Sequence, residues 1–243
     1  MKIAIVGYGR MGKLVEEYSI KRGHTITSII DPIKNTKIED LLKNEFDVII
    51  EFSIPEIALE NMKFYSTNNF KVIMATTGWY NKLPEVKNMF SKSGTILWSG
   101  NFSLGVHLFW KMVENTSKIM NKFEDYDVFG HEFHHNKKAD SPSGTAIKTA
   151  NIILENIDRK TSIITEELSH RAIKAEEIHF SSTRGGSIPG THQVYFDSVF
   201  DTIKIEHQAR TREGFALGSV VSAEWLKDKI GYFEIDDFIR ELI

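Results

Sequence analysis

The N-terminal segment constrains the fold most, because a short apolar run is followed at once by three spaced glycines. Lys2–Val6 is rich in β-branched residues and is expected to form a strand. Gly7, Gly9 and Gly12 make the pattern GxGxxG, and Met11–Arg22 then has helical periodicity. A strand, a glycine-rich turn and a helix in this order are typical of the opening unit of a doubly wound α/β fold that binds a dinucleotide. A purely structural turn is the alternative.

Each glycine has a separate expected role at such a site. Gly7 permits the tight turn, Gly9 lets the backbone approach a pyrophosphate, and Gly12 lets the helix pack on the strand. The helix N-terminus then faces the phosphate charge. The predicted cofactor-binding turn is the whole segment Gly7, Tyr8, Gly9, Arg10, Met11 and Gly12.

An acid at the end of the second expected strand indicates which nucleotide is bound. Asp31 lies about 20 residues after the turn, where an acid usually binds the adenosine ribose hydroxyls. Its charge would repel a 2′-phosphate, which favours NADH over NADPH. Lys34 and Lys37 follow in the next loop and could accept that phosphate, so NADPH stays open as a cofactor.

Short β-branched runs alternate with amphipathic runs over residues 1–100, which indicates a parallel sheet with crossover helices. The expected strands are Lys2–Val6, His24–Ile30, Asp47–Phe52, Lys71–Ala75 and Thr95–Trp98. The expected helices are Met11–Arg22, Pro55–Thr67 and Pro84–Ser91.

The pattern changes after Gly100, where strands later dominate and predict a mixed or antiparallel sheet in a second domain. The expected strands there are Tyr126–His134, Glu177–Thr183, Val194–Phe200 and Thr202–Gln208. The expected helices are Ser103–Phe123, Ser143–Asn156, Arg212–Lys227 and Ile235–Leu242. The predicted fold class is therefore α/β, a Rossmann-type doubly wound parallel sheet plus a second α+β domain with a mixed sheet.

Composition excludes several classes of protein. The net charge of −3 provides no broad basic surface for nucleic acid. The chain has no cysteine, which removes disulfides, thiolate nucleophiles and cysteine-based metal sites. It also lacks a run of about 18 apolar residues that could span a bilayer. We expect a soluble, cytoplasmic protein without a nucleic-acid or membrane partner.

The stretch His131–His135 has the letters HExxH, which raises the question of a zinc site. That motif binds zinc on a helix, where residues four apart lie on one face. The preceding residues predict a strand, and four residues of strand span about 13 Å, too far for both rings to reach one ion. We therefore predict no metal site, and a metallohydrolase is a minor alternative.

The second half of the same region points to an anion. Ser143-Gly144-Thr145 precedes an apolar helix face, so its free N–H groups lie at a helix N-terminus. Together with Lys138, they would suit a carboxylate. A nearby histidine can supply a proton near neutral pH. A dinucleotide, an anion site and a titrating histidine suggest hydride transfer to a small acidic substrate, although an ordinary helix cap is the simpler alternative at Ser143.

Residues 132–146, EFHHNKKADSPSGTA, resemble the E-x-H-H-x-x-K-x-D-x-P-S-G-T-A signature of the 4-hydroxy-tetrahydrodipicolinate reductase (dihydrodipicolinate reductase) family. Further motifs of that family follow its order along the whole chain. They are GYGRMG at 7–12, ATTG at 75–78, NFSLG at 101–105, RGGSIPGTH at 184–192 and HQARTR at 207–212.

The resemblance implies NADH- or NADPH-dependent reduction of a cyclic, unsaturated dicarboxylate to tetrahydrodipicolinate in lysine and diaminopimelate synthesis. It implies that His134 is the general acid and that Lys138 binds substrate and assists protonation. His135, Gly144 and Thr145 would hold the substrate carboxylates. Its nicotinamide contacts would fall on Thr77, Gly78, Asn101 and Phe102.

The resemblance also implies a domain division and an assembly. Residues 1–102 and 213–243 would form the dinucleotide-binding domain, and residues 103–212 the substrate-binding and oligomerisation domain, with hinges between them. The family is usually a homotetramer built through the second sheet. The chain departs from the family at Glu51, where Asp is common, at Asn136-Lys137, and at Thr191, which replaces a common Glu. Another Rossmann reductase acting on an imine or keto acid, such as an aspartate dehydrogenase, and a non-catalytic NAD-binding sensor are the alternatives.

Overall fold

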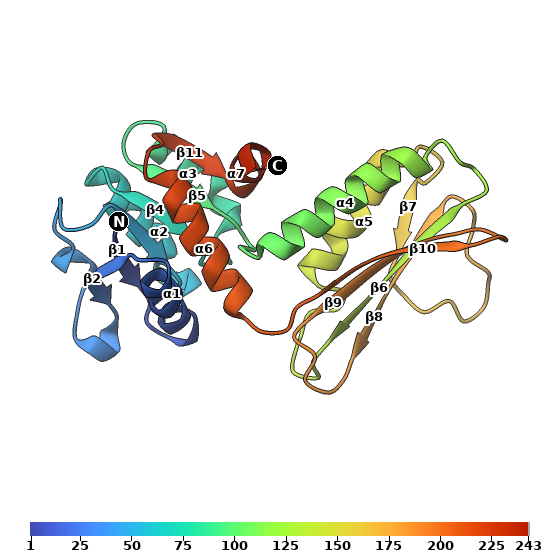
Figure 1. The fold of residues 1–243 in the computed structure, drawn as a ribbon, viewed down its shortest axis with the longest axis horizontal. Coiled ribbons are helices and arrows are strands. Elements are labelled where there is room, and N and C mark those ends of the chain that lie inside the picture. The colour runs from blue at the N-terminus through green and yellow to red at the C-terminus, as the bar shows by residue number, and fades with distance from the viewer. Residues whose placement is uncertain (243) are drawn as a thin grey trace. The chain divides into compact units, whose positions relative to one another are not determined.

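The computed structural model describes residues 1–242, which form two compact units. The first unit is Met1–Leu104 together with the described residues from Arg212 onward, and the second is Gly105–Thr211. Figure 1 shows that the first unit is completed by α6 (Glu213–Leu226) and α7 (Ile235–Leu242) from the end of the chain. The fold class predicted from the sequence is confirmed, since a parallel Rossmann-like sheet and a separate mixed sheet are both present.

Within the described residues, the first unit has a six-stranded sheet in the order β11-β5-β4-β3-β1-β2. Every neighbouring pair is parallel. The strands are β1 (Lys2–Val6), β2 (Thr25–Ile30), β3 (Val48–Glu51), β4 (Lys71–Met74), β5 (Thr95–Trp98) and β11 (Gly231–Glu234). The helices are α1 (Arg10–Lys21), α2 (Pro55–Thr67), α3 (Leu83–Phe90), α6 (Glu213–Leu226) and α7 (Ile235–Leu242), with 3-10 turns η1 (Pro32–Lys34), η2 (Ile38–Asp40) and η3 (Tyr80–Lys82).

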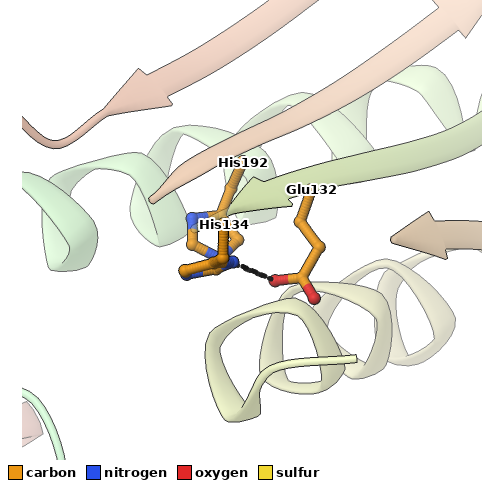
Figure 2. Close-up of side chains that lie close together, drawn as sticks. All are labelled: Glu132, His134 and His192. Carbon is orange, nitrogen blue, oxygen red and sulfur yellow. Dashed lines mark ion pairs between the residues drawn. The ribbon is translucent and has the colours of Figure 1, made fainter. Parts of the chain in front are cut away.

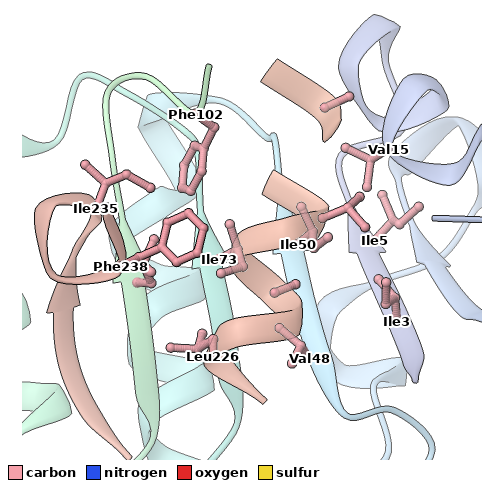
Figure 3. Close-up of a cluster of buried hydrophobic side chains, with 14 of the residues drawn as sticks. Ile3, Ile5, Val15, Val48, Ile50, Ile73, Phe102, Leu226, Ile235 and Phe238 are labelled. Atoms are coloured by element: carbon pink, nitrogen blue, oxygen red, sulfur yellow. The ribbon is translucent and has the colours of Figure 1, made fainter. Parts of the chain in front are cut away.

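Both faces of this sheet are apolar and covered by helices, as a parallel sheet requires. Side chains alternate between the faces, so Ile3 and Ile5 pack in one cluster with residues of α1, α6 and α7 (Figure 3). Ala4 and Val6 pack in the other cluster, with residues of α2 and α3. This two-sided burial fixes the sheet and leaves the carboxyl ends of its strands for ligands.

The second unit has a five-stranded sheet in the order β10-β9-β6-β8-β7 among the described residues. β9 is antiparallel to β10 and β6, whereas β6, β8 and β7 are parallel to one another. The helices α4 and α5 cover one face of it (Figure 1) and bury Phe109, Ile153 and Phe180 among others. The elements are α4 (Leu104–Met120), β6 (Asp127–His134), α5 (Gly144–Asn156), β7 (Ser162–Ile164), β8 (Glu177–Arg184), β9 (Thr191–Asp197) and β10 (Thr202–Gln208).

The largest differences from the sequence predictions concern three strands. The short strands β7 and β11 were not predicted. The strand expected at Val194–Phe200 was wrong at both ends, because β9 spans Thr191–Asp197. Ser198 begins the turn instead, since its side-chain oxygen accepts hydrogen bonds from the backbone N–H groups of Phe200 and Asp201. No helix within residues 1–242 has the length and apolar character needed to cross a membrane.

Candidate active site

The glycine-rich turn of the first unit has the shape that its spacing predicts. Gly7 has φ +86°, and a Cβ there would lie 2.3 Å from the carbonyl oxygen of Phe52. A Cβ at Gly12 would lie 2.2 Å from the carbonyl oxygen of Gly7, so both positions need glycine to pack. A Cβ at Gly9 would meet nothing within 4 Å. Gly9 caps α1 without a side-chain hydrogen bond, which leaves open backbone N–H groups that suit a phosphate.

A cavity of about 570 Å³ lies beside this turn and is lined by Gly7, Gly9, Asp31 and Lys37, among others. The Asp31 carboxylate accepts hydrogen bonds from Tyr8 N at 2.6 Å and from Ile33 N at 2.8 Å. It therefore holds the glycine-rich turn and caps η1. Each carboxylate oxygen has a second lone pair that can accept from a ribose hydroxyl, so these bonds are compatible with the predicted role of Asp31.

The residues expected to contact nicotinamide follow β4 and β5. Thr77 and Gly78 are exposed, and Gly78 has φ +89°. Asn101 and Phe102 line a second cavity of about 250 Å³ together with Met11. That cavity is also lined by Arg212, the last residue of the HQARTR motif, and by Phe215, and the sequence reasoning gave neither a role in the site. They are more than 100 residues from Asn101 in the sequence, and only the folded chain brings the start of α6 next to this sheet.

The HExxH letters lie on a strand, β6, and not on a helix. His131 contacts β8, with Nδ1 2.5 Å from Ser181 Oγ and Nε2 3.1 Å from Thr183 Oγ1. His135 lies just past the end of the strand, where its Nδ1 accepts from Lys137 N at 3.2 Å. The two histidines that a zinc peptidase would use are therefore engaged with different partners.

A different trio gathers on the opposite face of β6: Glu132, His134 and His192 (Figure 2). Glu132 and His134 are two residues apart and so share a face of the strand. His192 lies directly opposite Glu132 on β9. Glu132 Oε2 is 3.2 Å from His134 Nδ1 and 3.3 Å from His192 Nε2. All three side chains are buried.

The Glu132 carboxylate is already surrounded by donors, which argues against its use as a metal ligand. Arg184 Nη2 donates to Oε1 at 2.8 Å, and Ser182 Oγ donates to the same oxygen at 2.9 Å. Burial alone would raise the pKa of Glu132. The contacts with His134, His192, Ser143 and Arg184 outweigh that effect and hold its pKa far below the usual value. Glu132 is therefore a buried anion with a cation beside it.

Ser143 joins this carboxylate to the start of α5. Its backbone N–H donates to Glu132 Oε1 at 2.8 Å, and its hydroxyl donates to Oε2. Ser143 Oγ also accepts from Ala146 N at 3.1 Å as the helix cap. The next residue, Gly144, is exposed and a Cβ there would meet nothing within 4 Å. The expected anion-binding turn is thus fixed at Ser143 and open at Gly144.

The remaining predicted substrate residues lie in the loop before α5 and in its first turn. Lys138 Nζ is 2.7 Å from Asp140 Oδ1, and its side chain is about a quarter exposed. Thr145 is half-buried, and its carbonyl oxygen accepts from Thr149 Oγ1 at 2.7 Å. Burial lowers the pKa of His192, and the positive charge of Lys138 contributes to that shift.

Comparison with known proteins identifies the family. The model described as "Dihydrodipicolinate reductase, N-terminus" matches residues 1–102, and that described as "Dihydrodipicolinate reductase, C-terminus" matches residues 105–239. The chain belongs to the dihydrodipicolinate reductase family. Dihydrodipicolinate reductases are NAD(P)H-dependent oxidoreductases of lysine and diaminopimelate biosynthesis, so the resemblance read from the signature is confirmed.

Relatives of this reductase family match along the full chain. The 4-hydroxy-tetrahydrodipicolinate reductase of Christiangramia forsetii is 39% identical over 244 residues, which cover 100% of this chain and 99% of the relative. The enzyme of the same name from Staphylococcus carnosus is 34% identical and covers 98% of this chain and 99% of its own. A solved dihydrodipicolinate reductase from a Paenisporosarcina species, bound to dipicolinate, has a TM-score of 0.75 at 22% identity. It covers 96% of this chain and 97% of its own and supports the fold.

Proposed function

We propose that this protein reduces 4-hydroxy-tetrahydrodipicolinate to tetrahydrodipicolinate with NADH or NADPH. The reaction consumes one hydride and one proton and releases one water. Family membership supports the reaction type. The observation that carries the assignment of residues is that a buried histidine, His134, and the capped N-terminus of α5 contact the same carboxylate, Glu132.

His134 is the proposed general acid. A histidine can donate a proton near neutral pH, whereas a lysine mostly keeps its proton. Its Nδ1 faces Glu132, while Nε2 lies beside Gly190, where a Cβ would come within 2.9 Å. Because Gly190 has no side chain, we assign the proton donation to Nε2. Lys138 assists by its positive charge.

The first turn of α5 and the adjoining loop are the proposed binding site for the substrate carboxylates. Gly144 and Thr145 would donate backbone N–H groups, and Thr145 also its hydroxyl. His135 and Lys138 would add donors from the loop. The solved Paenisporosarcina reductase is bound to dipicolinate, a dicarboxylate of the same kind, which supports this substrate class.

The dinucleotide would be bound by the first unit and supply the hydride. The turn from Gly7 to Gly12 suits the pyrophosphate, and Asp31 the adenosine ribose. Thr77, Gly78, Asn101 and Phe102 are the proposed nicotinamide contacts. The buried Asp31 carboxylate in the cavity favours NADH, and Lys37, which lines the same cavity, would let NADPH bind more weakly.

The test follows the oxidation of NADH and NADPH with substrate generated from pyruvate and aspartate semialdehyde by its synthase. We expect rapid oxidation, and a loss of about 10²–10⁴-fold in kcat for His134→Gln with dinucleotide affinity unchanged. Full activity in that variant would refute the assignment of His134. A folded protein that binds dinucleotide without turnover would instead favour a sensor. A homotetramer and a cytoplasmic location stay predictions from the family resemblance.

A further inference from the structure

Glu132 has no assigned role in the reaction described above, yet its carboxylate contacts both the proposed general acid, His134, and the cap of α5, Ser143. Within the described residues, its carboxylate faces β6, β8, β9 and the cap of α5 at once. We propose that Glu132 is a positioning residue that stabilises the protonated form of His134 and holds the N-terminus of α5 in place for the substrate. This inference rests on the proposed function.

The first step of the argument is the sheet register. Glu132 pairs with His192 across β6 and β9, and His134 pairs with Arg184 across β6 and β8. Side chains at directly opposed or alternate positions of one face are close neighbours. The register therefore brings two histidines and one arginine together around the Glu132 carboxylate.

The second step is the distance between charges. Glu132 Oε2 lies 3.2 Å from His134 Nδ1, but the ring is turned so that Nδ1 has no aligned hydrogen-bond partner among the described residues. The interaction is therefore mainly one of charge, which favours the imidazolium over the neutral ring. Glu132 faces Nδ1, so Nε2 is left to hold the transferable proton.

The third step is the competing charge. Arg184 is 2.8 Å from Glu132 Oε1 and also donates to the carbonyl oxygen of Asp140 at 2.6 Å. It offsets part of the negative charge that His134 experiences. The other titratable groups are His192 on β9, whose ring packs on that of His134, and His207 beyond it on β10. Lys138, which forms an ion pair with Asp140 in the following loop, adds a positive charge that acts on His192.

The fourth step links the acid to the substrate-binding turn. Ser143 gives both its N–H and its hydroxyl to Glu132 and caps α5. The carboxylate thereby fixes the residue immediately before Gly144. Loss of its charge should therefore affect proton donation through His134 and substrate affinity through Ser143, whereas a simple structural residue would affect stability alone.

The test is an NMR titration of the His134 imidazole in the substrate-free protein, assigned by comparison with His134→Gln. In Glu132→Gln we expect the midpoint of the His134 titration to move lower, because a neutral amide replaces the carboxylate that lies 3.2 Å from Nδ1. In Arg184→Gln, which removes the competing cation, we expect it to move higher. The matched control is Glu177→Gln. Glu177 is also a buried carboxylate, and Arg171 donates to its two oxygens at 2.6 and 2.9 Å. It lies at the far end of β8, roughly 23 Å from Arg184.

Turnover provides the second readout. The high-pH limb of the kcat profile should move with the NMR midpoint, to lower pH in Glu132→Gln, and KM should rise about five-fold as Ser143 loses its ionic partner. Glu177→Gln should change neither quantity.

Unshifted midpoints in both variants, or shifts of the same sign, would overturn the proposal. If Glu132→Gln does not fold, the absence of an upward shift in Arg184→Gln overturns it alone. The titration needs no turnover, so an inactive wild-type protein would refute the proposed function separately.

Discussion

Two buried carboxylates, one in each unit, differ in the charge of their surroundings. Glu51 ends β3 and Glu132 lies in β6, and both side chains are fully buried. Glu132 has Arg184 beside it at 2.8 Å. Within residues 1–242, the donors in contact with Glu51 are all neutral: Ser53 Oγ, Asn61 Nδ2 at 3.0 Å and Tyr65 OH at 2.5 Å.

Equal burial therefore has opposite results at the two positions. At Glu51, burial is the dominant effect and raises the pKa, although three hydrogen bonds oppose it. At Glu132, burial also acts to raise the pKa, but the histidines, Ser143 and Arg184 together lower it far below its usual value. Neutral donors satisfy a buried carboxylate, but charged partners keep it ionised. Only a buried carboxylate that stays ionised can stabilise a neighbouring imidazolium.

The largest expected effect on stability is that of Glu132→Gln. Removing one partner of a buried ion pair leaves Arg184 without its counter-charge, so we expect a loss of about 3 kcal/mol in the free energy of unfolding at pH 7. The folded-state pKa of Glu132 lies below the unfolded value near 4.3. Its contribution is therefore present above about pH 4.3 and is lost as the pH falls further. Guanidinium unfolding of wild type and Glu132→Gln at pH 7 and pH 3.5 measures the stability lost by the variant at each pH. An equal loss at the two pH values would contradict the charged state of Glu132.

A smaller effect is expected from Tyr65→Phe, which removes a neutral donor from Glu51. The lost hydrogen bond to a buried group should cost about 1.5 kcal/mol, half the effect of removing the charge at Glu132. Tyr18→Phe is the matched control, because Tyr18 OH donates to Glu213 at 2.6 Å at an exposed position. Its expected cost is below about 0.5 kcal/mol. Denaturant unfolding of both variants measures the costs, and a loss at Tyr65 as large as that at Glu132 would remove the distinction between the two sites.

Most of the fold could be predicted from local patterns, and the elements that were not predicted correctly have local causes. β-branched runs and helical periodicity located the long elements, since each buries a face of its own. The strands β7 and β11 span only 3 and 4 residues, which is too short for a periodic pattern. Val199 and Phe200 have high strand propensity but are 92% and 85% exposed in a turn, because Ser198 provides the competing hydrogen bonds.

The candidate site was predictable where one segment carries it and not where distant strands build it. The turn at Gly7–Gly12 and the cap at Ser143 were visible as contiguous motifs. Glu132 lies in the signature, and its spacing of two from His134 on an expected strand was a usable signal. Its contacts with Arg184 and His192 depend on the pairing of β6 with β8 and β9. That register is set by tertiary packing and could not be read from one sequence.

The smallest expected effect is that of Glu51→Gln, and its pH dependence should be opposite to that of Glu132→Gln. The folded-state pKa of Glu51 is raised, so the native state binds its proton more tightly than the unfolded chain does. The stability that this proton provides is complete below the unfolded value near 4.3 and is lost as the pH rises through the folded value. An amide has no proton to lose. We therefore expect the free energy of unfolding of Glu51→Gln to be within about 1 kcal/mol of the wild-type value. Relative to wild type, the variant should become more stable as the pH rises from 5 to 8. Unfolding free energies at those two pH values measure the sign. If the variant is instead less stable relative to wild type at pH 8 than at pH 5, Glu51 is ionised and its charge stabilises the fold. Neutral donors alone would then be enough to hold a buried charge in this fold.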